Sequence, residues 1–189
     1  MRPGVTQRLA LAGLAPLVFV LACATGPFAR TPSARRPAPP TRPELPESVA
    51  PVRISSVATA GDPARRASTR LALEGLDADA AAEPALAADR YARALQVDPT
   101  NPWVYLALAR HRLDEGRPAD ALAALDQAEA RLRAEGALAP GVQVDLIGMR
   151  GAAFVACGNS DRGAALLSEA AHGAPDIWGD GHLDASELR

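Results

Sequence analysis

The 189-residue sequence predicts an all-α fold, a short solenoid of about three helical hairpins preceded by a signal peptide and a disordered Pro/Arg-rich linker. Three observations support it. Alanine and leucine supply most of the 48% hydrophobic content, and both are strong helix formers. Aromatic residues are only 4%, which disfavours strands. One pattern of large and small residues recurs between residues 67 and 175.

Residues 1–22 have the pattern of a signal peptide. Arg2 and Arg8 give a positive start, and residues 9–21 (LALAGLAPLVFVL) are apolar. Thirteen helical residues span about 20 Å, which is short of the roughly 30 Å hydrocarbon core of a membrane. The run is therefore better suited to a signal peptide than to a permanent membrane span.

The end of this run, Val20-Leu21-Ala22-Cys23, resembles the lipobox of bacterial lipoproteins. The resemblance implies cleavage before Cys23 and acylation of that residue with chains such as palmitate, which anchor it in lipid. Ala24 stands where an aspartate would indicate retention in an inner membrane. The resemblance therefore implies a lipid-anchored protein of the cell envelope, in the outer membrane and facing the periplasm. An ordinary secretory signal with a chance cysteine is the alternative.

Residues 23–66 form the predicted linker. They contain nine prolines, which cannot donate to helix or sheet ladders, and seven arginines against three acids. We expect a disordered tether with polyproline II character. Within it, residues 49–57 (VAPVRISSV) are β-prone and offer a strand for a partner's sheet edge. From residue 67 onward, 19 acids outnumber eleven arginines, and a net charge of −2 for the whole chain does not favour nucleic-acid binding.

The repeat is clearest at residues 101–132, where the pattern places Tyr105, Leu108, Ala109, Gly116, Ala121, Leu125 and Ala128. It resembles the tetratricopeptide repeat, a helical hairpin whose helices approach closely at small residues. Corresponding small and turn residues in the flanking units are Gly75, Ala82 and Ala87, then Gly151, Gly158 and Gly163. The turn positions Ala82, Gly116 and Gly158 lie 34 and 42 residues apart, so eight extra residues follow the middle unit. A helical bundle without repeats is the alternative.

Two local expectations follow from departures from this pattern. The extra residues should lengthen the second helix of the middle unit through Arg133, before Gly136 breaks it. The first hairpin should be loosely closed, because Ala82 stands in place of a turn glycine.

The resemblance implies a protein-interaction scaffold whose first helices line a concave face. The middle unit offers this face Trp103, Leu106, Arg110, Leu113 and Asp114. The corresponding residues are Thr69, Ala72, Leu76 and Asp79 in the first unit, and Asp145, Gly148, Ala152 and Val155 in the third. We expect a protein or peptide partner in the cell envelope, in an envelope assembly complex, with the oligomeric state left open. Trp103 alternatively packs as a helix-start residue on Tyr91 or Tyr105, and a non-specific surface spacer is an alternative function.

Residues 176–189 form a C-terminal tail that resembles a calcium loop imperfectly. Asp176, Asp180, Asp184 and Glu187 stand at ligand positions of an EF-hand, but Trp178 occupies another of them and has no oxygen to offer. A calcium-responsive accessory is therefore an alternative function, and no other cofactor is expected. The competing interpretation is a short helical cap, with Asp184 and Glu187 as a capping box.

The inventory of reactive residues does not support an enzyme. The chain has three histidines and no metalloprotease, CxxC or phosphate-loop motif. After acylation of Cys23, Cys157 is the remaining thiol, and it has no evident base beside it. We therefore expect no catalytic residues.

Overall fold

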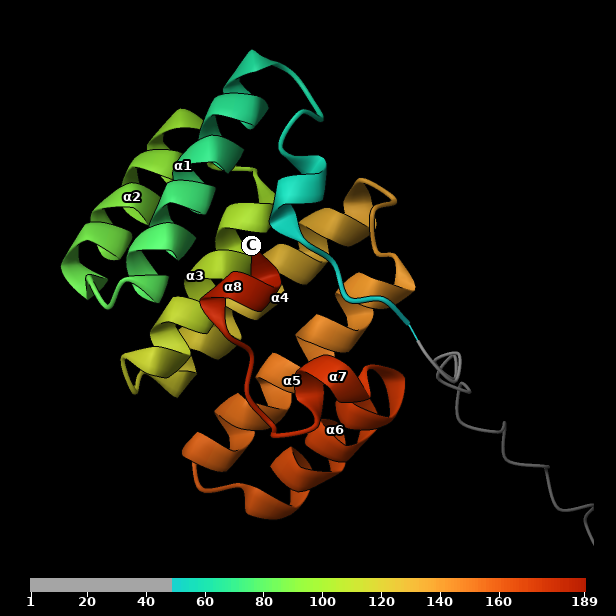
Figure 1. Cartoon of the computed structure of the whole chain (residues 1–189). Helices are drawn as coiled ribbons and strands as arrows, with labels where there is room; N and C mark the ends of the chain where they lie inside the picture. Colours follow the sequence, from blue (N-terminus) through green and yellow to red (C-terminus); the bar gives the residue numbers. More distant parts are fainter. Residues whose placement is uncertain (1–48) are drawn as a thin grey trace, which may run out of the picture. The chain divides into compact units, whose positions relative to one another are not determined.

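The computed structural model describes residues 49–189, and Figure 1 shows their arrangement. The predicted signal peptide 1–22, the lipidation site Cys23 and linker residues 24–48 lie outside the described residues. Those assignments stay predictions. No helix within residues 49–189 is long and apolar enough to cross a membrane.

Six helices form three antiparallel hairpins, and the described residues contain no strand. The hairpins are α1 (Pro63–Ala80) with α2 (Pro84–Val97), α3 (Pro102–Asp114) with α4 (Pro118–Ala134), and α5 (Pro140–Ala156) with α6 (Ser160–Gly173). Three short elements flank them: the 3₁₀ helix η1 (Ile54–Val57), α7 (Pro175–Trp178) and α8 (Ala185–Leu188). The predicted all-α fold of three stacked hairpins is therefore confirmed.

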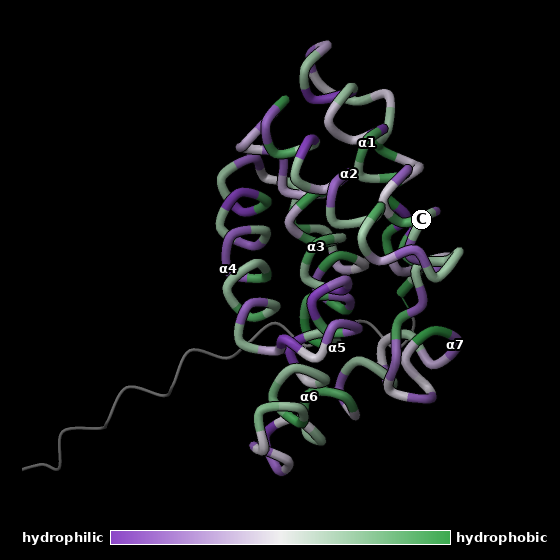
Figure 2. The backbone as a smooth tube through the Cα atoms, turned by 90° about the vertical axis from the view of Figure 1, so that its left-hand side faces the viewer, coloured by the Kyte–Doolittle hydropathy of each residue, from purple (hydrophilic) through white to green (hydrophobic). Residues whose placement is uncertain are grey.

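The first helices of the hairpins lie side by side, α1 against α3 and α3 against α5. The second helices pack on one side of this row, and we call the opposite side of α1, α3 and α5 the inner face. Along the outer helix α4, hydrophilic and hydrophobic residues alternate (Figure 2), as expected for a helix with one buried side. Its buried residues are Ala121, Ala124, Leu125, Ala128 and Leu132.

Local signals position the helices. Five of the six hairpin helices begin with a proline, whose fixed φ suits the first turn and whose missing N–H leaves no donor unpaired there. The side chain of Asn101 accepts a hydrogen bond from the Trp103 N–H and caps α3, as its place before Pro102 indicates. Asp62 accepts from the Arg65 N–H in the same way at the start of α1.

All three hairpins turn with the same backbone geometry. The turn residues Ala82, Gly116 and Gly158 have φ of 59°, 70° and 83°, in the left-handed region. In each turn the next residue's N–H bonds back to a helical carbonyl: Glu83 to Ala78 at 2.9 Å, Arg117 to Arg112 at 2.8 Å, and Asn159 to Phe154 at 2.8 Å. The first hairpin is thus closed by the same bonds as the others, and the loose turn expected there is not observed.

Small residues let the paired helices approach closely. A Cβ on Gly163 would lie 2.7 Å from the Gly151 carbonyl oxygen, so these two glycines bring the backbones of α5 and α6 together. In the first hairpin Gly75 makes room for the Tyr91 ring, and a Cβ there would lie 2.8 Å from Cζ. The extra residues of the middle unit lengthen α4 to 17 residues, against 14 in α2 and α6, and the chain then turns at Gly136.

The folded module begins earlier than the boundary predicted at residue 67. Residues 49–62 pack on the hairpins, and α1 starts at Pro63. Ile54 is fully buried, and Val49, Val52 and Val57 pack against the main hydrophobic core. Burial of these aliphatic side chains outweighs the proline content of this stretch. Residues 49–53 are extended, but they lie on this chain's own helices and not on a sheet edge.

Candidate protein-binding groove

The five residues predicted to bind a partner all lie on α3, but the structure exposes them unequally. Leu106 is completely buried and Trp103 is 8% exposed, and both belong to the main hydrophobic core. Arg110 is 5% exposed, whereas Leu113 is half-buried and Asp114 is exposed. Only the C-terminal end of α3 is therefore accessible along this face.

The chain's own last residues cover the rest of the inner face. We call Pro175–Arg189 the tail; it comprises α7, an extended link and α8. Arg110 Nε donates a hydrogen bond to the Leu183 carbonyl at 3.0 Å, and the Arg189 guanidinium donates to Asp77 of α1 at 3.0 Å. The tail thus runs from the third hairpin to the first, and Figure 1 shows α8 in front of α3.

A second segment, Val49–Val57, lies beside the tail, and we call it the strap. The Val49 N–H donates to the Gly173 carbonyl at 2.8 Å, and the Ser55 N–H donates to the Arg189 carbonyl at 2.8 Å. A Cβ on Gly141 would overlap the strap backbone at Ala50. The two segments therefore bind each other as well as the helices.

Asp145 of α5 joins both segments to the inner face. Its carboxylate accepts hydrogen bonds at 3.3 Å from the Val52 N–H of the strap and from the Trp178 indole of the tail. The indole lies flat against Gly148, where a Cβ would overlap it. Asp145 is fully buried.

Burial is the main cause that raises the pKa of Asp145, to about 7. The hydrogen bonds from Trp178 and Val52 act in the opposite direction, and the negative charge of Glu187 in the tail adds to the rise. The carboxyl group that holds both segments is therefore close to its titration point at neutral pH.

A buried charged cluster fixes Arg110. Asp79 of α1 accepts from Arg110 at 3.1 Å and from the Tyr91 hydroxyl at 2.8 Å, and Arg110 also donates to Asp114 at 2.6 Å. His111 Nδ1 lies 2.8 Å from Asp79. Burial, and then the charge of Asp79, raise the pKa of Tyr91, which stays a neutral donor. Because Asp79 and Asp114 bind the two terminal nitrogens of Arg110, its Nε is left to donate to the Leu183 carbonyl of the tail.

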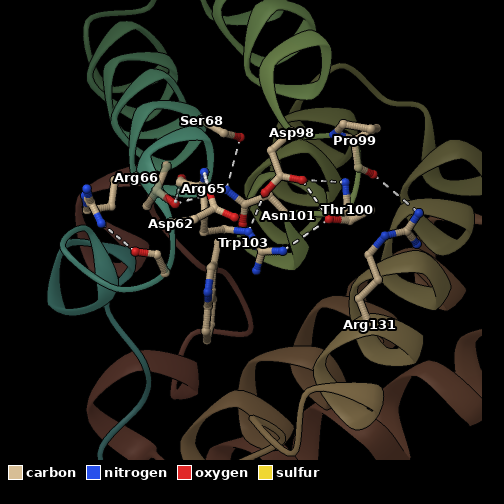
Figure 3. Close-up of polar contacts among 12 residues, drawn as sticks. Asp62, Arg65, Arg66, Ser68, Asp98, Pro99, Thr100, Asn101, Trp103 and Arg131 are labelled. Carbon is tan, nitrogen blue, oxygen red and sulfur yellow. Dashed lines mark hydrogen bonds and ion pairs between the residues drawn. The ribbon is translucent and has the colours of Figure 1, made fainter.

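A separate polar cluster joins the first two repeats at the opposite ends of the helices (Figure 3). Arg65 of α1 donates to Asp98 and Thr100, and Asn101 donates to Ser68 at 3.1 Å and to Thr69 at 2.9 Å. Burial raises the pKa of Asp98, but the bonds from Thr100 and Arg65 outweigh it and leave that pKa below its usual range. This cluster fixes the stacking of the repeats and offers no open site.

Part of the inner face stays open beside the tail. A cavity of about 240 Å³ is lined by Arg110, Leu113, Asp114, Met149, Ala152, Ala156, Trp178, His182 and Leu183. It has an apolar floor from α3 and α5 and a charged rim at Asp114. A second cavity, of about 550 Å³, lies where the first two hairpins turn, between Ala82 and His111, whose Nε2 has no hydrogen-bond partner.

The acids of the predicted calcium loop do not converge. Asp184 and Glu187 form a capping box at the start of α8, which confirms the cap interpretation, and Asp180 accepts from the His182 N–H. Asp176 lies in the first turn of α7. Within residues 49–189 no group of three or more histidines, cysteines or acids is placed to hold a metal ion. Calcium binding by this loop stays a prediction.

The sequence pattern placed Asp79, Asp145 and Gly148 on the inner face correctly, but it did not indicate what they bind. The tail residues Trp178, Leu183 and Leu188 are all buried, at a spacing of five residues. Neither helices nor strands have this period, so a search for periodicity does not detect it. The available signal was an aromatic and two leucines in an otherwise polar tail.

Comparison with known proteins agrees with this geometry. A tetratricopeptide-repeat family model matches residues 80–139, from the first turn to the loop after α4. Residues 80–139 therefore belong to a tetratricopeptide repeat, which is typically a protein-interaction module. No curated protein and no solved structure matches the chain.

Proposed function

We propose that this protein is a lipid-anchored interaction scaffold of the cell envelope. It binds a protein or peptide partner through its inner face and serves as an accessory of an envelope assembly complex. The observation that carries the proposal is that the inner face already holds a peptide segment. Arg110, fixed by two carboxylates, binds the main-chain carbonyl of Leu183, and such a contact does not depend on the side chain of the bound residue.

The sequence supports the anchor. The lipobox-like Val20–Cys23 segment provides the acylation site, and the residues between Cys23 and Val49 provide a tether to the repeats. Several acyl chains on one cysteine would bind lipid stably, because each buried CH₂ contributes about 0.8 kcal/mol.

Crosslinking in cells tests both halves of the proposal. After mild crosslinking and fractionation of the envelope, mass spectrometry should find a triacylated peptide beginning at Cys23, together with crosslinked envelope proteins. Cys23→Ser should release the protein from the membrane. An unmodified Cys23 in a soluble protein would refute the anchor.

A charge reversal at the rim tests the binding face. Asp114→Arg should reduce the crosslinked partner severalfold, because Asp114 lies at the open end of the inner face. Ser168→Arg, on an exposed position of the outer helix α6, is the matched control and should leave crosslinking unchanged. An equal loss of crosslinked partner in both variants, or no loss in either, would contradict binding at the inner face.

A further inference from the structure

The tail has the properties of a bound ligand. Trp178, Leu183 and Leu188 are between 0% and 4% exposed, whereas Gly179, Asp180, His182, Asp184 and Ser186 between them are exposed. A spacing of five residues matches no regular secondary structure. Ala185, three residues before Leu188 in α8, is buried with it, whereas the spacing of the three large side chains follows from their contact with the inner face.

At or next to each of the three buried side chains, the tail contacts a different hairpin. The Trp178 indole rests on Gly148 and donates to Asp145 in α5. Leu183 enters beside α3, where Arg110 binds its carbonyl. Next to the buried Leu188, Arg189 binds Asp77 of α1. The stacking of the repeats sets the spacing of these sites. A bound segment must therefore place its apolar side chains at the same spacing.

The tail is acidic, and its favourable ion pair with the face uses its one arginine. Asp176, Asp180, Asp184 and Glu187 give the tail four carboxylates, and one arginine is its only fixed positive charge. The face presents carboxylates at Asp77, which pairs with Arg189 of the tail, at Asp114, which pairs with Arg110, and at the buried Asp145. The negative charge of Glu187 acts unfavourably on the charged form of Asp145. A segment with the same apolar side chains and positive charges between them would bind this face better.

The tail also leaves a place where such a segment can begin to bind. The cavity of about 240 Å³ opens beside Trp178 and Leu183, with Met149 in its floor and Asp114 at its rim. A large apolar side chain fits such a volume, and a neighbouring basic side chain would lie against Asp114. An incoming segment can therefore make contacts before the tail leaves.

We infer that the tail is a displaceable internal occupant of the binding groove. The partner supplies an extended segment with an indole, a leucine five residues later and a second leucine after five more, with basic side chains between them. This inference rests on the proposed function and specifies the partner chemistry of the same face. Binding of the partner exchanges an acidic tail for a basic segment at the same three sites.

A synthetic probe tests the spacing and the charge together. The probe is a fluorescent peptide with the sequence of Pro175–Arg189, in which Asp176→Arg and Asp180→Arg remove two exposed acids. Its anisotropy is measured against the full chain and against a full-chain variant with Trp178→Ala and Leu188→Ala, whose tail has lost two of its buried side chains. We expect at least tenfold tighter binding to the variant.

Two controls define the site. A probe in which the tryptophan is replaced by alanine should bind at least tenfold more weakly. A probe with the unchanged acidic sequence should bind more weakly than the basic one, and this difference should shrink as salt is added. Equal binding of the three probes, or equal binding to the wild-type chain and the variant, would overturn the inference.

A measurement on the wild-type chain does not depend on the variant's folding. Hydrogen exchange with saturating basic probe should show loss of protection at the amides of Leu188 and Arg189, while α3 and α5 stay protected. Unchanged protection of the tail with the probe bound would overturn displacement. If crosslinking in cells still depends on Asp114 in that case, the proposed interaction function is supported. Only the inference that the partner displaces the tail is then refuted.

Discussion

The three hairpins and the two segments on their inner face are both buried, but they are held differently. Helices within a hairpin approach at Gly75, Gly151 and Gly163, where a Cβ would meet the facing helix. The tail contacts its face through a few apolar side chains and a few polar bonds. Burial alone does not make a segment part of the cooperative core, because few contacts over a small area allow local opening.

The largest loss of stability is expected when the two helices of the third hairpin are forced apart. Gly163→Ala places a Cβ 2.7 Å from both the Gly151 carbonyl oxygen and the Val155 nitrogen, and backbone atoms cannot yield cheaply. We expect a loss of about 3 kcal/mol in the free energy of unfolding, measured by urea denaturation. Ser168→Ala, exposed on the same helix, should be nearly neutral.

The same leucine-to-alanine change in a hairpin and in the tail compares how firmly the two regions are held. Leu125 and Leu188 are both 0% exposed, but the first lies between helices and the second in the tail. Leu125→Ala should lower global stability by about 3 kcal/mol. Leu188→Ala should lower it less, because its loss cannot exceed the free energy that attaches the tail. Similar shifts of the melting temperature in the two variants would show that the tail belongs to the cooperative core.

The attachment of both segments should depend on pH through Asp145. Its pKa of about 7 in the folded chain is above the unfolded value, so the folded state binds more protons between the two values. Stability should therefore fall as the pH rises from about 4 to about 7. Between pH 5 and 8 the loss should be on the order of 2 kcal/mol.

Asp145→Asn removes the titration and should flatten this part of the profile. Glu187 is the other charged group acting on Asp145, and Glu187→Gln should reduce the slope. The pKa of Asp98 and that of Glu129 are held low by their hydrogen bonds, so their contributions are lost only at more acidic pH. A profile of the Asn variant parallel to that of the wild type would contradict the assignment.

The smallest predicted effect concerns the first turn. Ala82 has a φ of 59° in a position where the other two hairpins have glycine. Ala82→Gly should stabilise the chain by up to about 1 kcal/mol, because an L-residue in the left-handed region is strained. Gly116→Ala is the reciprocal change and should destabilise by a similar amount. Thermal melts of the two variants that shift in the same direction would contradict this reading.

Much of the fold could be predicted from the sequence because hairpin packing depends on near neighbours. The turn positions, the small residues and the cap at Asn101 follow from local patterns, and all appear where they were expected. The family model independently supports residues 80–139.

The contents of the groove could not be predicted in the same way. Contacts such as Arg189 with Asp77, or Val52 with Asp145, join residues about a hundred positions apart and leave no periodic signal. Leu106 and Trp103 were placed on the correct helix, but the structure buries both. The first turn was also predicted incorrectly. Ala82 adopts the left-handed conformation that glycine prefers, because packing of the hairpin overrides the preference of alanine.

Hydrogen exchange of the full chain at low denaturant, without any added peptide, tests the central claim most directly. The amides of Leu188 and Arg189, which bond only within the short α8, should exchange at least 100-fold faster than those of α3. Their rates should hardly change with denaturant, as local opening requires. Protection equal to that of α3, with the same denaturant dependence, would show that the tail opens only when the repeats unfold.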